Sequence, residues 1–147
     1  MPKITTEWQR FEQLSADMLY EVLRFRQSIF VVEQGSPYAD LDGLDREARH
    51  LLLRSDGELA GYLRLIQMPV RIGRVAVALQ LRRRGLGRRL MEEALRFCRE
   101  RHPAQDIILA AQQNLVPFYS SFGFAVISEP YDDCGVMHVE MRMQLCG

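Results

Sequence analysis

The sequence lacks the features typical of secreted, membrane and metal-bound proteins. No run approaches the ~18 consecutive apolar residues of a membrane span, and the N-terminal segment MPKITTEWQRFEQ has no apolar core of a signal peptide. Cysteine occurs only at Cys98, Cys134 and Cys146, without CxxC or Cys/His spacing, which argues against a disulfide framework or a structural zinc site. We therefore expect a soluble protein of the reducing cytoplasm, with no metal and no membrane partner.

A net charge of one sign is missing as well. Nineteen acidic residues balance nineteen basic ones, so the molecule lacks the long-range positive field of a general nucleic-acid binder. Lysine is nearly absent, because Lys3 is the only one and all the other basic residues are arginine. The choice of arginine at any single position therefore carries little information, and any attraction for anions must be local.

What the sequence does contain is an alternation of strand and helix patterns along 147 residues. This length predicts one domain, 1–147, that buries roughly 68–70% of the surface of its unfolded chain. Ser15 is suited to cap a helix, and Asp56-Gly57 is a strong hairpin signal. The pattern predicts an α/β or α+β fold, one sheet with helices on both faces. Expected strands are 6–12, 50–55, 58–67, 72–79, 106–111, 124–128 and 136–144; expected helices are 16–34, 85–101 and 115–122.

The stretch LRRRGLGRRL, residues 81–90, holds five arginines and two glycines. Three interpretations compete: a solvated helix face, a nucleic-acid footprint, and a phosphate cradle. A strand, a glycine-bearing turn and a helix start in succession leave backbone N–H groups pointing at one spot, where the helix dipole adds positive charge. Zero net charge and the lack of interleaved aromatic residues argue against nucleic acid.

The spacing Arg82-x-x-Gly85-x-Gly87 resembles the acetyl-CoA signature of the GNAT superfamily of N-acetyltransferases. Three further segments resemble that superfamily in the same order: IGRVAVA before the turn, DIILAA after its helix, and NLVPFYSSFGF at 114–124. FRQSIFVVEQGSPYADLDGLDREARH is similar to the ElaA-type branch, from which Ser36 and Met137 depart. The resemblance implies the GNAT fold, a mixed and mostly antiparallel central sheet with helices on both faces.

The same resemblance implies how acetyl-CoA binds. The backbone of Val75, Ala76 and Val77 would pair with the pantetheine arm like an added strand, which suits the two amides of pantetheine. Asn114 would touch the pantetheine, and by its residue type it is also a good N-cap for the helix that contains Pro117. The turn from Arg83 to Arg88 would hold the pyrophosphate, and the cofactor-binding residues expected in this region are Arg82, Arg83, Arg84, Gly85, Leu86, Gly87 and Arg88. Which arginines meet the 3′-phosphate stays open.

Three residues are candidates for proton transfer. Tyr119 is either a core residue or the general acid that protonates the departing thiolate, since a phenol with a pKa of ~10 is suited to that task. An alkylammonium with a pKa of ~10.4 must lose a proton before its nitrogen attacks a thioester, so a general base is needed. Glu33, at the end of the first helix, is the first candidate; it could equally face solvent. His50 could act with it or cap the acidic loop.

The acceptor is expected to be a small-molecule or peptide amine. Two acidic segments, 40–47 and 129–133, are solvated loops by default, but would favour a cationic amine if both flanked one mouth. The function predicted is acetyl transfer by direct attack of the amine in a ternary complex. Alternatives are a non-catalytic acyl-CoA-binding module and an RNA-binding domain. We expect a monomer or homodimer that binds no nucleic acid.

Overall fold

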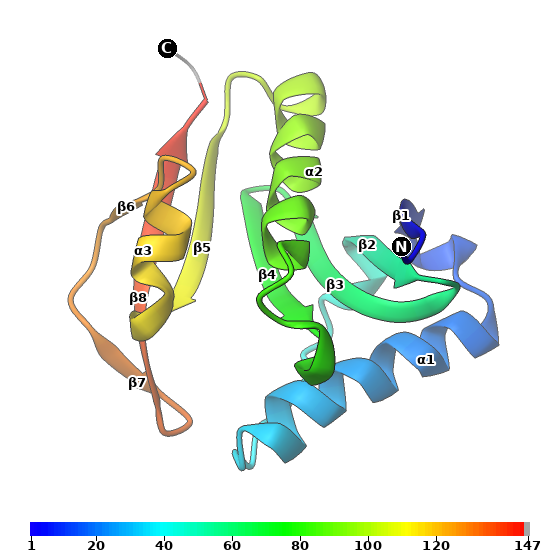
Figure 1. Cartoon of the computed structure of the whole chain (residues 1–147). Helices are drawn as coiled ribbons and strands as arrows, with labels where there is room; N and C mark the ends of the chain where they lie inside the picture. The colour runs from blue at the N-terminus through cyan, green and yellow to red at the C-terminus, as the bar shows by residue number, and fades with distance from the viewer. Residues whose placement is uncertain (146–147) are drawn as a thin grey trace.

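The computed structural model describes residues 1–145, and Cys146 lies outside the described residues. Eight strands form one sheet in the order β1-β2-β3-β4-β5-β8-β6, with β7 paired to β8 (Figure 1). Every pair is antiparallel except β4 and β5, which run parallel. The strands are β1 (Ile4–Arg10), β2 (Arg49–Ser55), β3 (Glu58–Gln67), β4 (Val70–Val77), β5 (Asp106–Gln112), β6 (Ala125–Val126), β7 (Tyr131–Asp133) and β8 (Val136–Gln144).

Three α-helices pack on this sheet. α1 (Ala16–Gln27) continues as a π-helix over Ser28–Glu33, α2 (Leu86–Arg101) follows the glycine-bearing turn, and α3 (Val116–Ser120) is short. Among residues 1–145, no helix has the length and apolar character needed to cross a membrane. Short 3₁₀ turns cover Phe11–Gln13, Asp45–Glu47, Leu79–Leu81 and Gln113–Leu115.

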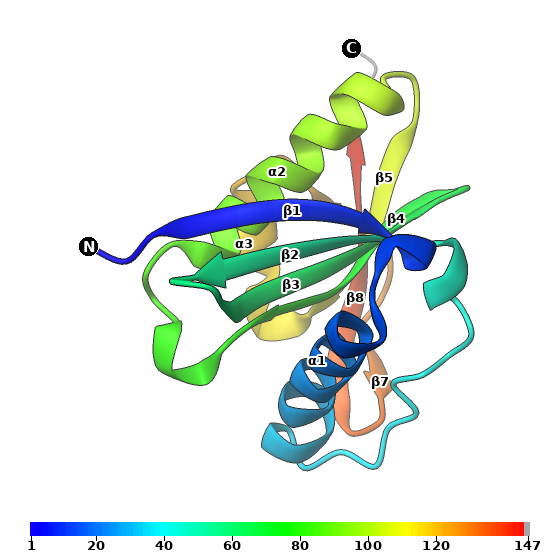
Figure 2. The same ribbon diagram turned by 90° about the vertical axis from the view of Figure 1, so that its right-hand side faces the viewer.

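Alternation along β2 explains why helices cover both faces. Leu52 packs with Val22 of α1, whereas Leu51 and Leu53 belong to the larger core formed with α2. Successive side chains of a strand point to opposite faces, so one fully buried strand serves two layers. α1 and α2 lie on opposite sides of β1–β3 (Figure 2). The mostly antiparallel sheet with helices on both faces confirms the predicted fold.

The first helix begins where the sequence predicted. The hydroxyl of Ser15 accepts a hydrogen bond from the Met18 N–H at 3.1 Å, which satisfies one of the unpaired donors of the first turn. At the other end, the wider π-helical turn carries the chain to Glu33. It places Phe30 and Gln34 beside the sheet, and π-helical turns are frequent at functional sites.

β4 and β5 separate after a short parallel contact. They pair only at Arg71 with Ile108 and at Ile72 with Leu109, and the two strands diverge beyond that point (Figure 1). On the other side of β4, the register with β3 shifts by one residue at Arg74, whose φ is +53°. This bulge bends β4 and increases its local twist. An opening between two neighbouring strands results in the middle of the sheet.

Several predicted boundaries differ from the structure. β1 ends at Arg10, and the expected strand residues Phe11 and Glu12 form a 3₁₀ turn. The expected strand 124–128 is reduced to Ala125–Val126, and β7 was not predicted. The prediction that Asn114 caps the helix containing Pro117 was wrong. The chain first makes a 3₁₀ turn over Gln113–Leu115, and α3 begins at Val116 without a side-chain cap.

Candidate active site

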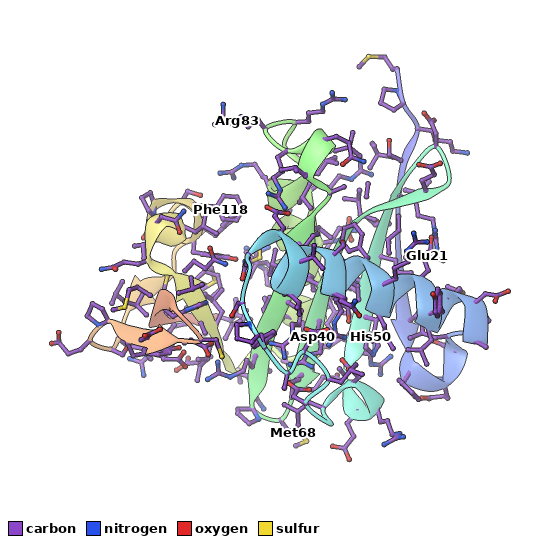
Figure 3. All side chains as sticks on the ribbon, turned by 90° about the horizontal axis from the view of Figure 1, so that it is seen from below. Glu21, Asp40, His50, Met68, Arg83 and Phe118 are labelled. Atoms are coloured by element: carbon purple, nitrogen blue, oxygen red, sulfur yellow. The ribbon has the colours of Figure 1, made fainter. Side chains whose placement is uncertain are left out.

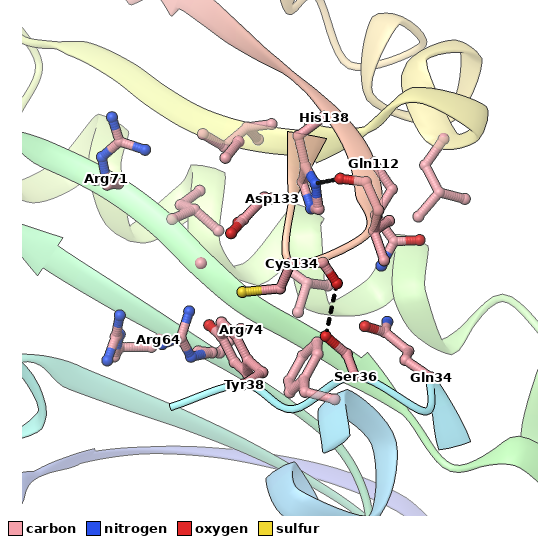
Figure 4. Close-up of a pocket in the computed structure, with 18 of the residues that line it drawn as sticks. Gln34, Ser36, Tyr38, Arg64, Arg71, Arg74, Gln112, Asp133, Cys134 and His138 are labelled. Atoms are coloured by element: carbon pink, nitrogen blue, oxygen red, sulfur yellow. Dashed lines mark hydrogen bonds between the residues drawn. The ribbon is translucent and has the colours of Figure 1, made fainter. Parts of the chain in front are cut away.

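Two connected pockets occupy the opening between β4 and β5. The larger, with a volume of about 670 Å³, lies between the π-helical end of α1, the end of β4, the turn over 82–88 and α3. The smaller, about 180 Å³, lies between β4, β5 and the β7–β8 hairpin (Figure 4). Both pockets are lined by Phe30, Gln34, Val75, Gln112, Leu115 and Tyr119. Two ligands that occupied the pockets would meet at these residues.

The turn before α2 presents backbone donors to the larger pocket. Gly85 has a φ of +77°, a left-handed conformation that glycine adopts without a steric penalty. The first bond of the helix runs from the Arg89 N–H to the Gly85 carbonyl at 3.1 Å. The N–H groups of Leu86, Gly87 and Arg88 precede it and have no partner within the helix. Such a helix start attracts a phosphate.

A free strand edge faces the same pocket. β4 pairs with β3 on one side, and its register with β5 covers Arg71 and Ile72 alone. The side of Val75–Val77 that faces β5 therefore has no strand partner in the described chain. All three residues line the larger pocket. An extended chain with amide groups, such as pantetheine, fits this edge by β-strand addition.

The arginines of the turn have different surroundings. Arg82 donates to both carboxylate oxygens of Glu33, at 2.5 and 2.7 Å, and to the Val77 carbonyl at 3.0 Å. Arg88 lies over the Phe122 ring at 4.6 Å. Arg83 and Arg84 are exposed. Arg82 thus ties the end of α1 to the end of β4, and the exposed arginines stay available to an anion.

Tyr119 on α3 stands where the two pockets meet. Its side chain is packed edge-on against Phe118 and Phe124, with ring centroids 5.1 and 6.4 Å away. Burial raises the pKa of its phenol to about 12. Tyr119 lines both pockets. Only 6% of the residue is exposed, so it is also a core residue. Asn114 is exposed and lines the larger pocket.

The smaller pocket is closed by the β7–β8 hairpin. Its turn, Cys134-Gly135, has two positive φ values, +51° and +88°, which match the right-handed twist of the flanking strands. The Ser36 hydroxyl donates to the Cys134 carbonyl at 2.8 Å and joins the loop after α1 to the hairpin (Figure 4). Asp133 and His138 point into this pocket from the hairpin.

Comparisons with known proteins agree with this architecture. Residues 12–145 match the family model described as the acetyltransferase (GNAT) domain. This chain belongs to the GNAT acetyltransferase family. It is 38% identical to protein ElaA of Escherichia coli over 95% of this chain and 97% of ElaA. The ElaA crystal structure superimposes with a TM-score of 0.92, covering 97% of this chain and all of that one.

Two other GNAT structures extend the comparison. An acyl-CoA N-acyltransferase from Pseudomonas aeruginosa is 34% identical, with a TM-score of 0.89 over 96% of this chain and 99% of that one. A GNAT acetyltransferase from Elizabethkingia anophelis, solved with acetyl-CoA bound, has a TM-score of 0.67 at 15% identity, over 97% of this chain and 98% of that one. The latter likeness shows the fold.

In this GNAT domain, the two residues expected to act as the base lie in different places. Glu33 lines the larger pocket, but both of its oxygens are occupied by Arg82. His50 is 1% exposed and lines neither pocket. Its ring nitrogens bond the Tyr62 hydroxyl at 2.6 Å and the Asp45 carbonyl at 2.9 Å. Figure 3 shows His50 in a different part of the molecule from Arg83 and Phe118. The structure does not bring His50 to Glu33 and Tyr119.

The acidic segment 40–47 is held by arginines, although Asp42 and Glu47 are exposed. Asp40 and Asp45 are 8% and 9% exposed, and both pair with the fully buried Arg26, at 2.9 and 2.7 Å. Arg64 bonds Asp42 and Asp45 at 2.8 and 3.2 Å. Arg74, from the bulge of β4, pairs with Asp40 and Asp42 at 2.8 and 3.2 Å. We call these six residues the arginine–aspartate cluster. Its carboxylates hold the loop against β3 and β4, so they do not attract a cationic ligand.

Several pocket residues were not predicted. Phe30 and Gln34 line both pockets because α1 continues as a π-helix. Gln112 lines both because β5 ends at the opening. His138 faces Gln112 across the β5–β8 pair, a register that no local pattern contains. The alternation of the strand VMHVEMRMQ places His138 on the face opposite the buried Val139.

Proposed function

We propose that this GNAT protein is an acetyl-CoA-dependent N-acetyltransferase that works by direct attack of an amine on the thioester. The observation that carries the proposal is the position of Tyr119, which lines both pockets where they meet. The larger pocket would take acetyl-CoA and the smaller one the amine. Bound acetyl-CoA supplies the activated acetyl group, and the chain's own residues position it and move protons.

The binding residues follow from the free edge and the helix start. The backbone of Val75–Val77 would bind the pantetheine arm, and Asn114 lines the same pocket. The unpaired N–H groups at Gly85–Arg88 would bind the pyrophosphate, with Arg83 and Arg84 free to meet phosphate oxygens. We assign Glu33 a positioning role, since its bonds to Arg82 fix the end of α1 beside the strand edge.

Tyr119 would act as the general acid. As the N–C bond forms and the C–S bond breaks, the sulfur takes the electron pair and the phenolic proton. Burial keeps the pKa of Tyr119 at about 12, so the phenol stays protonated, and able to donate, through the neutral range. A general acid of this kind contributes about 10²–10⁴-fold to the rate.

We infer that the amine acceptor is cationic, on the evidence of only the second of the two acidic segments that the sequence indicated, 129–133. Arg64 and Arg74 are paired within the arginine–aspartate cluster, and Arg71 pairs with Glu140 at 2.7 Å. That pairing leaves Asp133 as the carboxylate without an arginine partner among the described residues of the smaller pocket. An ammonium group would be favoured there.

The test is a thiol-release assay with acetyl-CoA and four amines: spermidine, phenethylamine, glucosamine and a lysine peptide. Tyr119→Phe keeps the ring that packs on Phe118 and Phe124 and removes only the hydroxyl. We expect kcat to fall about 10²–10⁴-fold with little change in acetyl-CoA affinity and thermal midpoint. Acetyl-CoA binding without turnover of any amine would indicate the non-catalytic alternative. A stable Phe variant with more than half the parent kcat would exclude Tyr119 as the acid.

A further inference from the structure

His138 lines the smaller pocket and uses one of its ring nitrogens in a hydrogen bond to the backbone. Its Nδ1 lies 2.9 Å from the Val136 carbonyl oxygen, which can only accept, so Nδ1 carries the hydrogen. In the neutral ring, Nε2 then keeps its lone pair. His138 lies across from Gln112, a residue shared by the two pockets (Figure 4). His138 itself lines the smaller pocket, which is the one proposed for the amine.

Neighbouring side chains hold this ring in place. The Tyr131 ring stacks on it, with centroids 6.1 Å apart and planes inclined by 26°. Tyr131 donates its hydroxyl hydrogen to Glu140 at 2.7 Å, and Glu140 accepts from Arg71 at 2.7 Å. This chain of contacts joins β7, β8 and β4. The Tyr131 ring thus holds one face of the imidazole. Tyr131 and Glu140 use their polar groups in bonds to each other and to Arg71.

The other titratable groups of the smaller pocket are poor proton acceptors. The arginines hold carboxylates and stay charged. Burial raises the pKa of Tyr38, and burial with the bond to Glu140 raises that of Tyr131 to about 12, so both phenols remain protonated. The pKa of the Cys134 thiol is also raised, by desolvation and by Asp133. Carboxylates in general are weaker bases than imidazole, by about 2.6 pKa units for aspartate. The titratable groups that line the pocket beside His138 are Tyr38, Arg64, Arg71, Arg74, Tyr119, Asp133 and Cys134, and Tyr131 packs on the His138 ring without lining the pocket.

We propose that Nε2 of His138 is the general base of the reaction. The assignment rests on the proposed function. Nε2 takes one proton from the acceptor ammonium and passes it to solvent. The nitrogen lone pair then forms the N–C bond, the C–S pair leaves with sulfur, and Tyr119 protonates that sulfur. The remaining surplus proton on the new amide nitrogen restores the Tyr119 phenol, so one amide, one thiol and one released proton result.

His138→Asn separates this role from a structural one. The Asn amide nitrogen occupies the position of Nδ1 and can still donate to the Val136 carbonyl, whereas nothing replaces Nε2. We expect kcat to fall about 10²–10⁴-fold at neutral pH for the best amine of the four, with an unchanged thermal midpoint. His102→Asn is the matched control, because His102 bonds Gln67 at 3.0 Å outside both pockets.

The pH profile of kcat/KM provides a readout that packing would not move. With His138 as the base, the enzyme deprotonates the bound ammonium itself, so kcat/KM should reach a plateau around neutral pH that does not follow the fraction of free amine. His138→Asn must wait for free amine, whose fraction rises tenfold per pH unit below an amine pKa of ~10.4. We therefore expect no plateau in the variant and a rate gap that narrows at high pH.

Nitrogen NMR of histidine-labelled protein tests the geometry without turnover. We expect the neutral His138 ring with hydrogen on Nδ1, the resonance being assigned through its loss in His138→Asn. A hydrogen on Nε2, or a variant that keeps both the plateau and more than half the parent rate, would overturn the assignment while leaving the acetyltransferase function intact. Failure of all four amines with wild-type protein would instead reject the function, and the base with it.

Discussion

The arginines of the arginine–aspartate cluster and those of the turn over 82–88 place the same side chain in opposite surroundings. Arg26 is fully buried and its guanidinium bonds two carboxylates and a backbone carbonyl. Arg83 and Arg84 are exposed at the turn. In the cluster each charge is cancelled locally, as is that of Arg82 by Glu33, whereas the charges of Arg83 and Arg84 remain available. The comparison teaches that the number of charges in a segment says little about its electrostatic field until the partners are known.

Removing the buried arginine of the arginine–aspartate cluster should have the largest effect on stability. Arg26→Ala leaves Asp40 and Asp45 buried without their shared cation. Removing one partner of a buried ion pair costs about 3–5 kcal/mol, so the free energy of unfolding in urea should fall by that amount. Arg96→Ala, which removes a surface pair with Glu93, serves as the control and should leave the midpoint unchanged. Equal midpoints for the two variants would contradict the clamp role of the cluster.

Lowering the pH should also weaken the arginine–aspartate cluster. Burial opposes ionisation of Asp42, but the hydrogen bond from Arg64 outweighs it, and the pKa falls to about 2. This folded value lies below the ~3.9 of an unfolded chain, so the stabilisation, which solvent screens because Asp42 is partly exposed, is complete well above that pH and is lost as pH falls through about 2. Urea unfolding followed from about pH 7 to pH 2 should show the loss. In Asp42→Asn, the free energy of unfolding should depend less on pH over this range. If the variant lost as much stability between about pH 7 and pH 2 as the wild-type protein, Asp42 would not be the source of the loss.

A substitution in the turn over 82–88 should reduce acetyl-CoA binding rather than the stability of the fold. A Cβ at Gly87 would lie 3.5 Å from the Phe118 ring and 3.9 Å from Val77, in ordinary contact, and all three residues line the larger pocket. Gly87→Val should therefore fold normally but fill the space beside the free N–H groups. We expect at least a roughly tenfold loss of acetyl-CoA affinity, about 1.4 kcal/mol, by calorimetry. Unchanged affinity in the folded variant would place the cofactor elsewhere.

The exposed arginines should have the smallest effect. Exposed ion pairs contribute at most about 1 kcal/mol each, so Arg83→Ala and Arg84→Ala should each weaken acetyl-CoA binding a few-fold. Added salt should reduce the difference, since exposed charges are screened over ~8 Å at physiological ionic strength. Arg99→Ala, on the exposed face of α2, controls for net charge. A salt-independent loss would indicate that the arginines act through the fold of the turn.

Local signals in the sequence were sufficient for much of the fold. Ser15 caps α1, Asp56-Gly57 turns between β2 and β3, and the glycine-bearing turn precedes α2, because each depends on neighbours a few residues away. β7 escaped prediction because Tyr131–Asp133 is short and acidic, and pairs only after the Cys134-Gly135 turn forms. Short strands of this kind are stabilised by their partner strand more than by their own composition.

Residues that line the pockets were predicted where they belong to a contiguous motif and were missed where distant segments meet. The resemblance covered the turn and Tyr119, both of which line the larger pocket. The partners of Asp40 in Arg26 and Arg74 are 14 and 34 residues away, so the acidic loop was taken for a solvated one. Glu33 gave no sign of its contact with Arg82, 49 residues further along the chain. These pairings are properties of the packed sheet.

The free edge of Val75–Val77 has a consequence for solubility. Unpaired strand edges invite other chains to add a strand, and proteins usually protect the outermost strands of a sheet for that reason. Here the open edge lies inside the sheet, and the larger pocket is also walled by Gln112, Asn114 and Phe118 from β5 and the segment up to α3. A folded neighbour cannot bring a strand into such a slot. The protein thus keeps backbone donors and acceptors open to a slender ligand without offering a template for aggregation.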